Sequence, residues 1–408
     1  MKRSIIYFVV FTYLLAFGGM KIAHAKGDIN SLVPDKSLPI VKKSLNIAMF
    51  LPLSYDRISE LDFTKFNIED KKRLKYRCFE YITFYEGARI ALDKLEKEGY
   101  SVSLYVYDVG EEDVAEMNKV LQNPEMKTMD LLIPLVFHNC FTAAADFALK
   151  NSIPIINPMS PNPTIVENNP FVFKIQPSTV ADVETTVRYI KNKFTSPNII
   201  VLFTPKEKLV MEMYQRAIER ENWTWSGIDF NKYQNRIFEK IDTKKENIYI
   251  SIVDKGNQQL NEAYANTLLM KLNNNKGLPP INLIAQYDWL DYPSLDLKLI
   301  QKFNFHFTLS YLNDYTNQNF VEFVKEYRKH FRQEPDKIYA ALGYDIMMYF
   351  VPAMQHKGNS FITEPNEDRT KVMINSFYFD RKDPKDGWQN RRTVVYKVSD
   401  YKIISVGR

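Results

Sequence analysis

The sequence predicts an α/β protein made of two units of similar size, each with a mainly parallel sheet. Short apolar runs such as "LNIAMFLPL" (45–53) are typical of strands that are buried on both faces of a sheet. These runs alternate with segments of helical spacing, which is the pattern of a parallel sheet covered by helices. The alternation occurs twice in 408 residues, a length that suits two domains better than one.

The elements of the first unit follow one another without a break in the pattern. A helix over 79–99 has Phe84, Ala88, Ala91 and Leu95 at helical spacing and ends at Gly99. The other expected elements of this unit are strands at 45–53, 101–109, 130–137 and 153–156, helices at 112–122 and 141–151, and an insertion at 54–77.

The second unit repeats this order after a junction near 170–180. Its expected strands are 198–203, 247–253, 281–287 and 305–311, with helices at 206–221, 258–273 and 293–302. Helices at 319–331 and 338–355 and late strands within 374–380 and 393–406 complete the chain.

The N-terminus has the pattern of an export signal. Lys2 and Arg3 precede the apolar run 5–17, and Ala23-His24-Ala25 is typical of a signal-peptidase site. The alternative is an uncleaved anchor, but the run is short for a membrane span of about 20 residues. We therefore expect cleavage after position 25, a lead-in or linker at 26–44, and a soluble protein in the periplasm or otherwise outside the cytoplasm.

Charge and cysteine content exclude some classes of protein. Removal of Lys2, Arg3 and Lys21 with the signal lowers the formal charge from +5 to +2, and basic residues do not cluster as they do in a nucleic-acid-binding face. Cys78 and Cys140 either form one disulfide or stay as buried thiols, and the sequence does not decide between these alternatives.

Motifs of enzymes and of metal or cofactor sites are missing from the sequence. There is no G-x-G-x-x-G, P-loop, H-E-x-x-H, C-x-x-C or G-x-S-x-G, and the histidines show no ligand spacing. We therefore expect no catalytic residues, no metal and no cofactor.

Polar and aromatic residues follow the expected strands at their carboxyl ends, where open parallel sheets bind ligands. Free N–H groups at a helix start bind carboxylates, a serine adds a donor, and an acid can pair with an amine. The same residues also serve as caps, turns or core in proteins without a ligand. The candidate ligand-binding residues are Ser54, Phe137, His138, Asn139, Met159, Ser160, Asp288, Trp289 and Tyr292.

The stretch 153–178 combines a buried strand with an unusually stiff loop, since it holds six of the chain's 20 prolines. Together with "IAMFLPLS", "FYEGARIALD", "YVYDVGEED" and the late segment 323–354, this stretch resembles the type I periplasmic solute-binding proteins of the branched-chain amino-acid receptor family. The resemblance runs from about 45 to 408.

The resemblance implies two Rossmann-like lobes joined by three hinge crossings, with a ligand held between them. It places lobe 1 at 45–172 and 312–358 and lobe 2 at 173–311 and 359–408. It also implies a small polar ligand, such as an amino acid or short peptide, and delivery to a membrane permease. The proteins of this fold include envelope scaffolds that regulate peptidoglycan synthesis, so a cell-wall enzyme as partner is the alternative.

Overall fold

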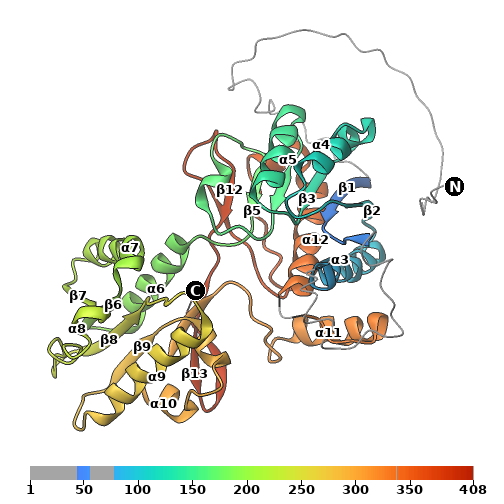
Figure 1. Cartoon of the computed structure of the whole chain (residues 1–408). Helices are drawn as coiled ribbons and strands as arrows, with labels where there is room; N and C mark the ends of the chain where they lie inside the picture. The colour runs from blue at the N-terminus through green and yellow to red at the C-terminus, as the bar shows by residue number, and fades with distance from the viewer. Residues whose placement is uncertain (1–43, 56–77, 337, 408) are drawn as a thin grey trace. The chain divides into compact units, whose positions relative to one another are not determined.

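The computed structural model describes residues 44–55, 78–336 and 338–407, and within these ranges the chain forms two seven-stranded sheets (Figure 1). The first group of elements comprises β1 (Ser44–Leu51), α3 (Cys78–Lys97), β2 (Ser101–Asp108), α4 (Val114–Leu121), η2 (Pro124–Thr128), β3 (Leu131–Pro134), α5 (His138–Asn151), β4 (Ile155–Asn157), η3 (Pro163–Val166) and β5 (Val172–Lys174). The expected insertion, signal and linker lie outside the described residues, apart from Ser44, Ser54 and Tyr55.

The second group comprises α6 (Thr179–Lys193), β6 (Pro197–Phe203), η4 (Pro205–Glu207), α7 (Lys208–Arg220), β7 (Trp225–Asp229), α8 (Phe230–Tyr233), β8 (Glu246–Ser251), α9 (Gln258–Asn274), β9 (Ile281–Ile284), η5 (Tyr287–Asp291), α10 (Leu297–Lys302) and β10 (His306–Leu309). The last elements are α11 (Gln318–Phe331), α12 (Tyr339–Lys357), η6 (Gly358–Ile362), β11 (Phe379–Asp380), β12 (Trp388–Asn390), β13 (Val394–Ser399) and β14 (Lys402–Gly407).

Both sheets are built on the same strand order. The first sheet runs β11-β12-β5-β4-β3-β1-β2 and the second runs β14-β13-β10-β9-β8-β6-β7. Leaving out the strands at one edge, each sheet has the doubly wound order 2-1-3-4-5, whose ligands bind where the order reverses. The core strands are parallel, whereas β11–β12, β10–β13 and β13–β14 are antiparallel pairs. The expected pair of α/β units is confirmed.

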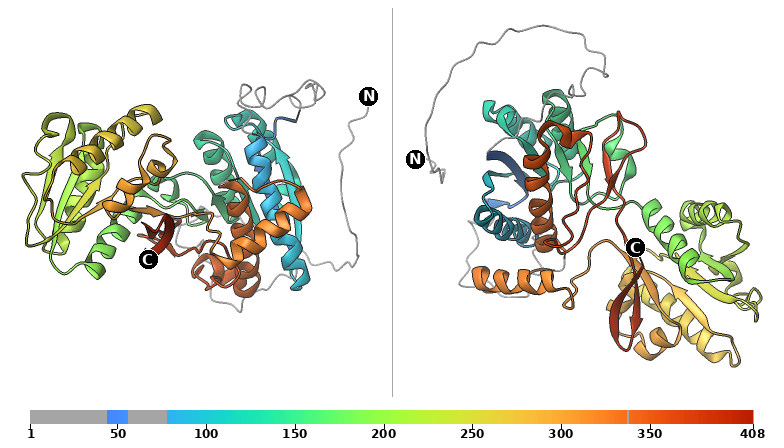
Figure 2. Two further views of the ribbon diagram at one scale, coloured as in Figure 1. Left: turned by 90° about the horizontal axis from the view of Figure 1, so that it is seen from below. Right: turned by 180° about the vertical axis from the view of Figure 1, so that it is seen from behind.

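The first sheet is buried on both faces because its strands alternate between two helix layers. Ile47, Met49 and Leu51 pack on the side of α3, α11 and α12, whereas Ala48 and Phe50 pack on the side of α4 and α5. Figures 1 and 2 show these helices on the two faces of the sheet. A strand that is buried on both sides must be apolar throughout, which explains the run "LNIAMFLPL".

The second sheet follows the same rule. Ile200 and Leu202 of β6 pack towards α9 and α10, and Ile199 and Val201 pack towards α6 and α7.

The chain passes three times between the two sheets. It leaves the first sheet after β5, returns between β10 and α11, and leaves again between β12 and β13. The strands β11 and β12 pair within the first sheet through β5, so 379–390 lie with the first sheet although the sequence analysis grouped 359–408 with the second lobe. A parallel partner for the edge strand β5 decides this placement, and the sequence pattern alone does not show it.

The sequence missed several short elements. The strands β5, with three residues, and β7, with the sequence "WSGID", were not expected, because short strands carry little periodicity. Cys140 is buried and free, as the buried-thiol alternative requires. Gly99, with φ of 92°, follows the end of α3 as expected. No helix in the described part of the chain combines the length and apolarity needed to cross a bilayer.

Candidate functional site

The loop after β1 uses its backbone donors within the protein. Ser54 has a left-handed backbone with φ of 53°. The N–H groups of Leu53, Ser54 and Tyr55 donate to the Asp108 carboxylate at 2.9, 3.0 and 2.8 Å. Asp108 therefore occupies these three donors, and the predicted contact at Ser54 rests on the Ser54 hydroxyl.

The start of α5 presents the first-turn N–H groups of a 14-residue helix. Phe137 is its N-cap residue, and the Phe137 N–H donates to the Glu111 carbonyl at 2.8 Å. His138 and Asn139 are exposed in the first turn, where N–H groups have no intrahelical partner and the helix dipole favours an anion. Of the predicted first-lobe contacts, this turn suits a carboxylate best.

The proline-rich loop after β4 is stiffened by successive side-chain turns. The Ser160 N–H donates to Asn157 Oδ1 at 2.7 Å, and Ser160 Oγ accepts from the Asn162 N–H at 3.2 Å. Asn162 Oδ1 in turn accepts from the Thr164 N–H at 3.0 Å, at the start of η3. The loop is fixed by its own polar groups, and the Ser160 O–H is the donor that these bonds leave over.

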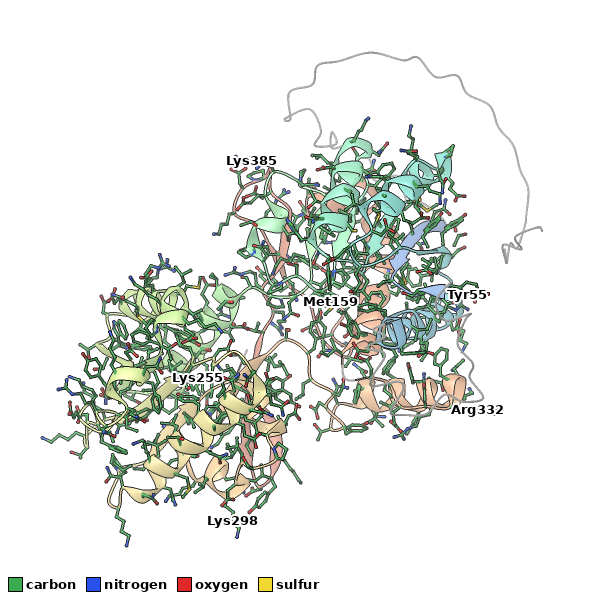
Figure 3. All side chains as sticks on the ribbon, in the orientation of Figure 1. Tyr55, Met159, Lys255, Lys298, Arg332 and Lys385 are labelled. Carbon is green, nitrogen blue, oxygen red and sulfur yellow. The ribbon has the colours of Figure 1, made fainter. Side chains whose placement is uncertain are left out.

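A cavity of about 140 Å³ joins the ends of β3 and β4. Its lining is Tyr81, Pro134, Leu135, Val136, Phe137, Asn157, Pro158, Met159 and Tyr339. Cavities of about 150 Å³ hold one benzene ring, so this cavity suits one aromatic or branched aliphatic group. The structure thus brings the predicted residues Phe137 and Met159 together around an apolar space (Met159 is labelled in Figure 3).

Two of the predicted second-lobe residues belong to the core. Trp289 is 2% exposed, stacks on Phe305 with ring centroids 5.7 Å apart and meets Tyr264 edge-on at 6.0 Å. Tyr292 is 8% exposed and belongs to the same cluster. Trp289 of η5 and Tyr292, which follows η5, are both buried, so Asp288 is the one exposed residue of these three predicted contacts.

A polar cluster lies at the ends of β6 and β8, where the strand order of the second sheet reverses, and none of its residues is among the predicted site residues. Glu207 Oε2 accepts from the N–H and hydroxyl of Thr204 at 2.9 and 2.6 Å. Glu207 Oε1 is buried and has no hydrogen-bond partner among the described residues. The spacing "TPKE" is that of a capping box, which is the sequence signal that could have drawn attention to this turn.

An ion pair between Lys206 of this turn and Asp254, which follows β8, lies next to Glu207 in the chain. Lys206 Nζ lies 3.2 Å from Asp254 Oδ2. Hydrogen bonds from the Gly256 N–H and the Asn261 amide lower the pKa of Asp254 below its usual value, with a smaller contribution from Lys206. Asp254 therefore stays ionised at neutral pH.

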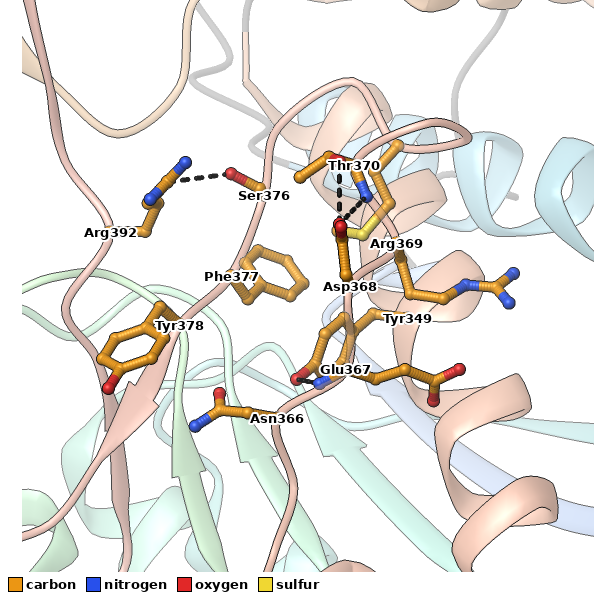
Figure 4. A pocket seen from close by; sticks show the side chains of 11 residues that line it. Tyr349, Asn366, Glu367, Asp368, Arg369, Thr370, Ser376, Phe377, Tyr378 and Arg392 are labelled. Atoms are coloured by element: carbon orange, nitrogen blue, oxygen red, sulfur yellow. Dashed lines mark hydrogen bonds between the residues drawn. The ribbon is translucent and has the colours of Figure 1, made fainter. Parts of the chain in front are cut away.

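A separate cavity of about 460 Å³ contains none of the predicted site residues. It lies under the loop 366–378 beside α12, with Tyr349 and Phe377 in its wall (Figure 4). Two charged side chains of this loop are engaged with α12, because Glu367 bonds His356 at 2.9 Å and the Arg369 Nε donates to the Met348 carbonyl at 3.2 Å. We base the candidate site on the smaller cavity because it lies at the strand ends.

Known proteins match this chain in fold. A transporter protein for branched-chain amino acids from Rhodopseudomonas palustris matches with a TM-score of 0.59 and 15% identity, over 89% of this chain and 95% of the other. A branched-chain amino-acid transporter protein from Rhodospirillum rubrum matches with a TM-score of 0.58 and 14% identity, over 89% of this chain and 100% of the other. A substrate-binding protein from Desulfitobacterium hafniense, in complex with Leu, matches with a TM-score of 0.51 and 15% identity, over 89% of this chain and 100% of the other.

These matches establish the fold class as that of the two-lobe periplasmic binding proteins. The expected fold is thereby confirmed. No model of a known protein family and no curated protein sequence matches the chain.

Proposed function

We propose that this chain is an exported, non-catalytic solute-binding protein that captures a small polar ligand with one apolar group and delivers it to a membrane permease. The observation that carries the proposal is the 140 Å³ apolar cavity beside the first turn of α5. An anionic group at the helix start and an apolar group in the cavity are the two recognition elements of an amino acid or short peptide. The sequence signal at 1–25 supports export.

The second lobe supplies negative charge for the remaining part of such a ligand. Asp288 is exposed beyond β9, and Glu207 has one buried carboxylate oxygen without a partner among the described residues. Closure of the second lobe over a ligand held by the first would bring a carboxylate to the ligand's amine, as hinge closure does in periplasmic binding proteins in general.

A thermal-shift screen with single amino acids, short peptides and muropeptides tests this proposal. A ligand that binds the folded state raises the melting temperature by mass action. We expect stabilisation by a compound with an aromatic or branched aliphatic side chain. The absence of any stabilising small molecule, together with capture of a cell-wall enzyme, would contradict it.

One observation favours the alternative of an envelope scaffold that contacts a cell-wall enzyme. The three N–H donors of the loop 53–55 are already bonded to Asp108, so the first lobe offers fewer free donors to a small ligand than its sequence predicts. The screen separates the two functions, because only the receptor function requires a small molecule.

Asp288→Ala is expected to weaken binding of an amine-bearing hit more than Ser160→Ala does. Loss of a hydrogen bond to a charged group costs about 1.5–3 kcal/mol, or roughly tenfold to a hundredfold in affinity. Loss of the neutral Ser160 hydroxyl should cost about 1 kcal/mol. Titration calorimetry on both variants measures the difference, and unchanged affinity in both would remove these residues from the site.

A further inference from the structure

We propose that a second site, for a small oxyanion such as inorganic phosphate or a carboxylate, lies at the hinge of this protein. The site is a cavity of about 210 Å³ lined by Glu184, Thr185 and Arg188 of α6 and by Tyr378, Asp380, Arg391, Arg392 and Thr393. It shares no residue with the cavity at the ends of β3 and β4 and goes beyond the proposed function.

The charges of the cavity leave a positive excess. Three arginines face two acids, and one acid is taken up because Arg391 Nη2 is paired with Glu184 Oε2. Asp380 is exposed at the cavity wall, and its Oδ1 accepts from the Arg381 N–H at 2.9 Å. Arg188 is exposed and has no hydrogen bond or ion pair with the described residues. A bidentate oxyanion is the partner that best matches an unpaired guanidinium.

A buried hydroxyl in the same cavity points independently to a ligand. Thr393 is 2% exposed, and its Oγ1 has no hydrogen-bond partner among the described residues. A buried polar group without a partner costs about 1–3 kcal/mol. An oxyanion that accepts from the Thr393 O–H would remove this cost.

The wall that carries these residues is held in place before any ligand binds. Asn390 is 1% exposed, donates its amide to the Ile175 carbonyl at 3.0 Å and accepts from the Arg392 N–H at 3.0 Å. The Arg391 N–H donates to the Tyr378 carbonyl at 2.7 Å, and Arg392 Nε donates to Ser376 Oγ at 3.0 Å. The chain segments of the first and third crossings between the sheets are thus hydrogen-bonded to each other. Arg391 and Arg392 therefore belong to a segment that is held in place.

The volume agrees with a small, partly hydrated anion. A cavity needs about 10–15 Å³ of this kind of volume to hold one water, so 210 Å³ has room for a small anion together with water. Because Arg188 belongs to α6 and Thr393 to the third crossing, an anion bound to both would link the helix that starts the second lobe to a hinge strand. Binding should therefore bias the motion of the two lobes.

Titration calorimetry with inorganic phosphate and, separately, with acetate tests the site at constant ionic strength in the full exported chain. We expect binding of one of these anions to the wild type and to Arg220→Gln, which removes an exposed arginine at the end of α7. Arg188→Gln and Thr393→Val should each bind that anion about tenfold more weakly or worse.

The result that overturns the proposal is equal binding by all four proteins, or binding by none of them. Thr393→Val is nearly isosteric, so its melting temperature without anion checks that the wall is intact. The anion site and the cavity at the ends of β3 and β4 share no residue. A negative result for anion binding therefore leaves the proposed function untouched, and a negative result in the ligand screen leaves the anion site untouched.

Discussion

Alanine at Gly343 is expected to destabilise the first lobe by about 2 kcal/mol, because α12 and α3 touch backbone to backbone at this glycine. A Cβ at Gly343 would lie 2.1 Å from the Phe84 carbonyl oxygen, and a Cβ at Gly87 would lie 1.8 Å from the Ala340 carbonyl oxygen. Neither contact is relieved by a rotamer change, since the opposing atoms are backbone. The helices would have to separate, and overpacking of this kind costs about 1–3 kcal/mol or more.

Helix propensity acts against the steric clash at Gly343 and reduces the expected loss of stability. Ala is favoured over Gly in a helix interior by about 1 kcal/mol, so the measured loss is the clash minus this gain. Gly110→Ala, in the loop before α4, is the control for the loss of a glycine without a backbone clash, because its Cβ would approach the Asp113 Cβ at 3.2 Å and the Asp113 N at 3.9 Å. Urea unfolding of the three proteins measures the free energies. Equal stability of Gly343→Ala and the wild type would mean that the helices do not pack as described.

Replacement of Asp345 by alanine is expected to cost about 3–5 kcal/mol of unfolding free energy. Asp345 is fully buried on α12 and accepts from the Ile374 N–H at 2.7 Å and from the Asn375 N–H and amide at 2.9 and 3.1 Å. These bonds hold the segment that leads to β11. Alanine would remove the acceptor of one buried donor, the Ile374 N–H, and of two part-buried donors of Asn375, and a buried donor without a partner costs about 1–3 kcal/mol.

The same carboxyl makes stability depend on pH. Burial raises the pKa of Asp345 to about 7, against the effect of its three hydrogen bonds. Between about pH 4 and about pH 7 the folded state keeps a proton on Asp345 that the unfolded state has released. The contribution of Asp345 to stability therefore falls as pH rises from about 4 to about 7 and is constant above that. The loss is on the order of 4 kcal/mol from one carboxyl, at 1.36 kcal/mol per pKa unit.

Asp345→Asn isolates this contribution, since it keeps the shape and removes the titration. Other buried acids, such as Asp182 with a pKa raised by burial to about 6, titrate in both proteins and cancel in the difference. The unfolding free energy of the wild type, measured relative to that of Asp345→Asn at the same pH, should therefore decrease as the pH rises from about 4 to about 7. A difference that stays constant with pH would show that Asp345 does not titrate in this range.

Periodicity in the sequence was enough to predict the layered core, because a strand buried on both faces must be apolar at every position. Ile47 and Ala48 point to opposite helix layers, and both are completely buried. The close approach of Gly87 and Gly343 could not be predicted, since a glycine within a helix pattern carries no sign of the helix that packs against it. The same holds for Asp345, whose partners lie about 30 residues away in the chain.

The site could be predicted in part. Phe137 and Met159 follow strands that are neighbours in the sheet, so the rule of strand ends brought them together. Trp289 follows a strand in the same way, yet it lies in the core, because the direction of a side chain in a short turn depends on packing that periodicity does not encode. The Asp108 carboxylate that occupies the donors of the loop 53–55 was missed because it comes from the neighbouring strand β2.

The most direct test of the proposed function is calorimetric titration of the best compound from the screen into wild type, Met159→Trp and Met270→Trp. Met159 is half-buried in the wall of the 140 Å³ cavity, so an indole there should fill the space intended for the apolar group. Met270 is 48% exposed on α9 and serves as the matched control. We expect Met270→Trp to bind like the wild type and Met159→Trp to lose at least roughly a hundredfold in affinity, from the loss of a buried side chain worth about 1.5–3 kcal/mol together with steric exclusion. Equal affinity in all three proteins would contradict the claim that this cavity receives the ligand.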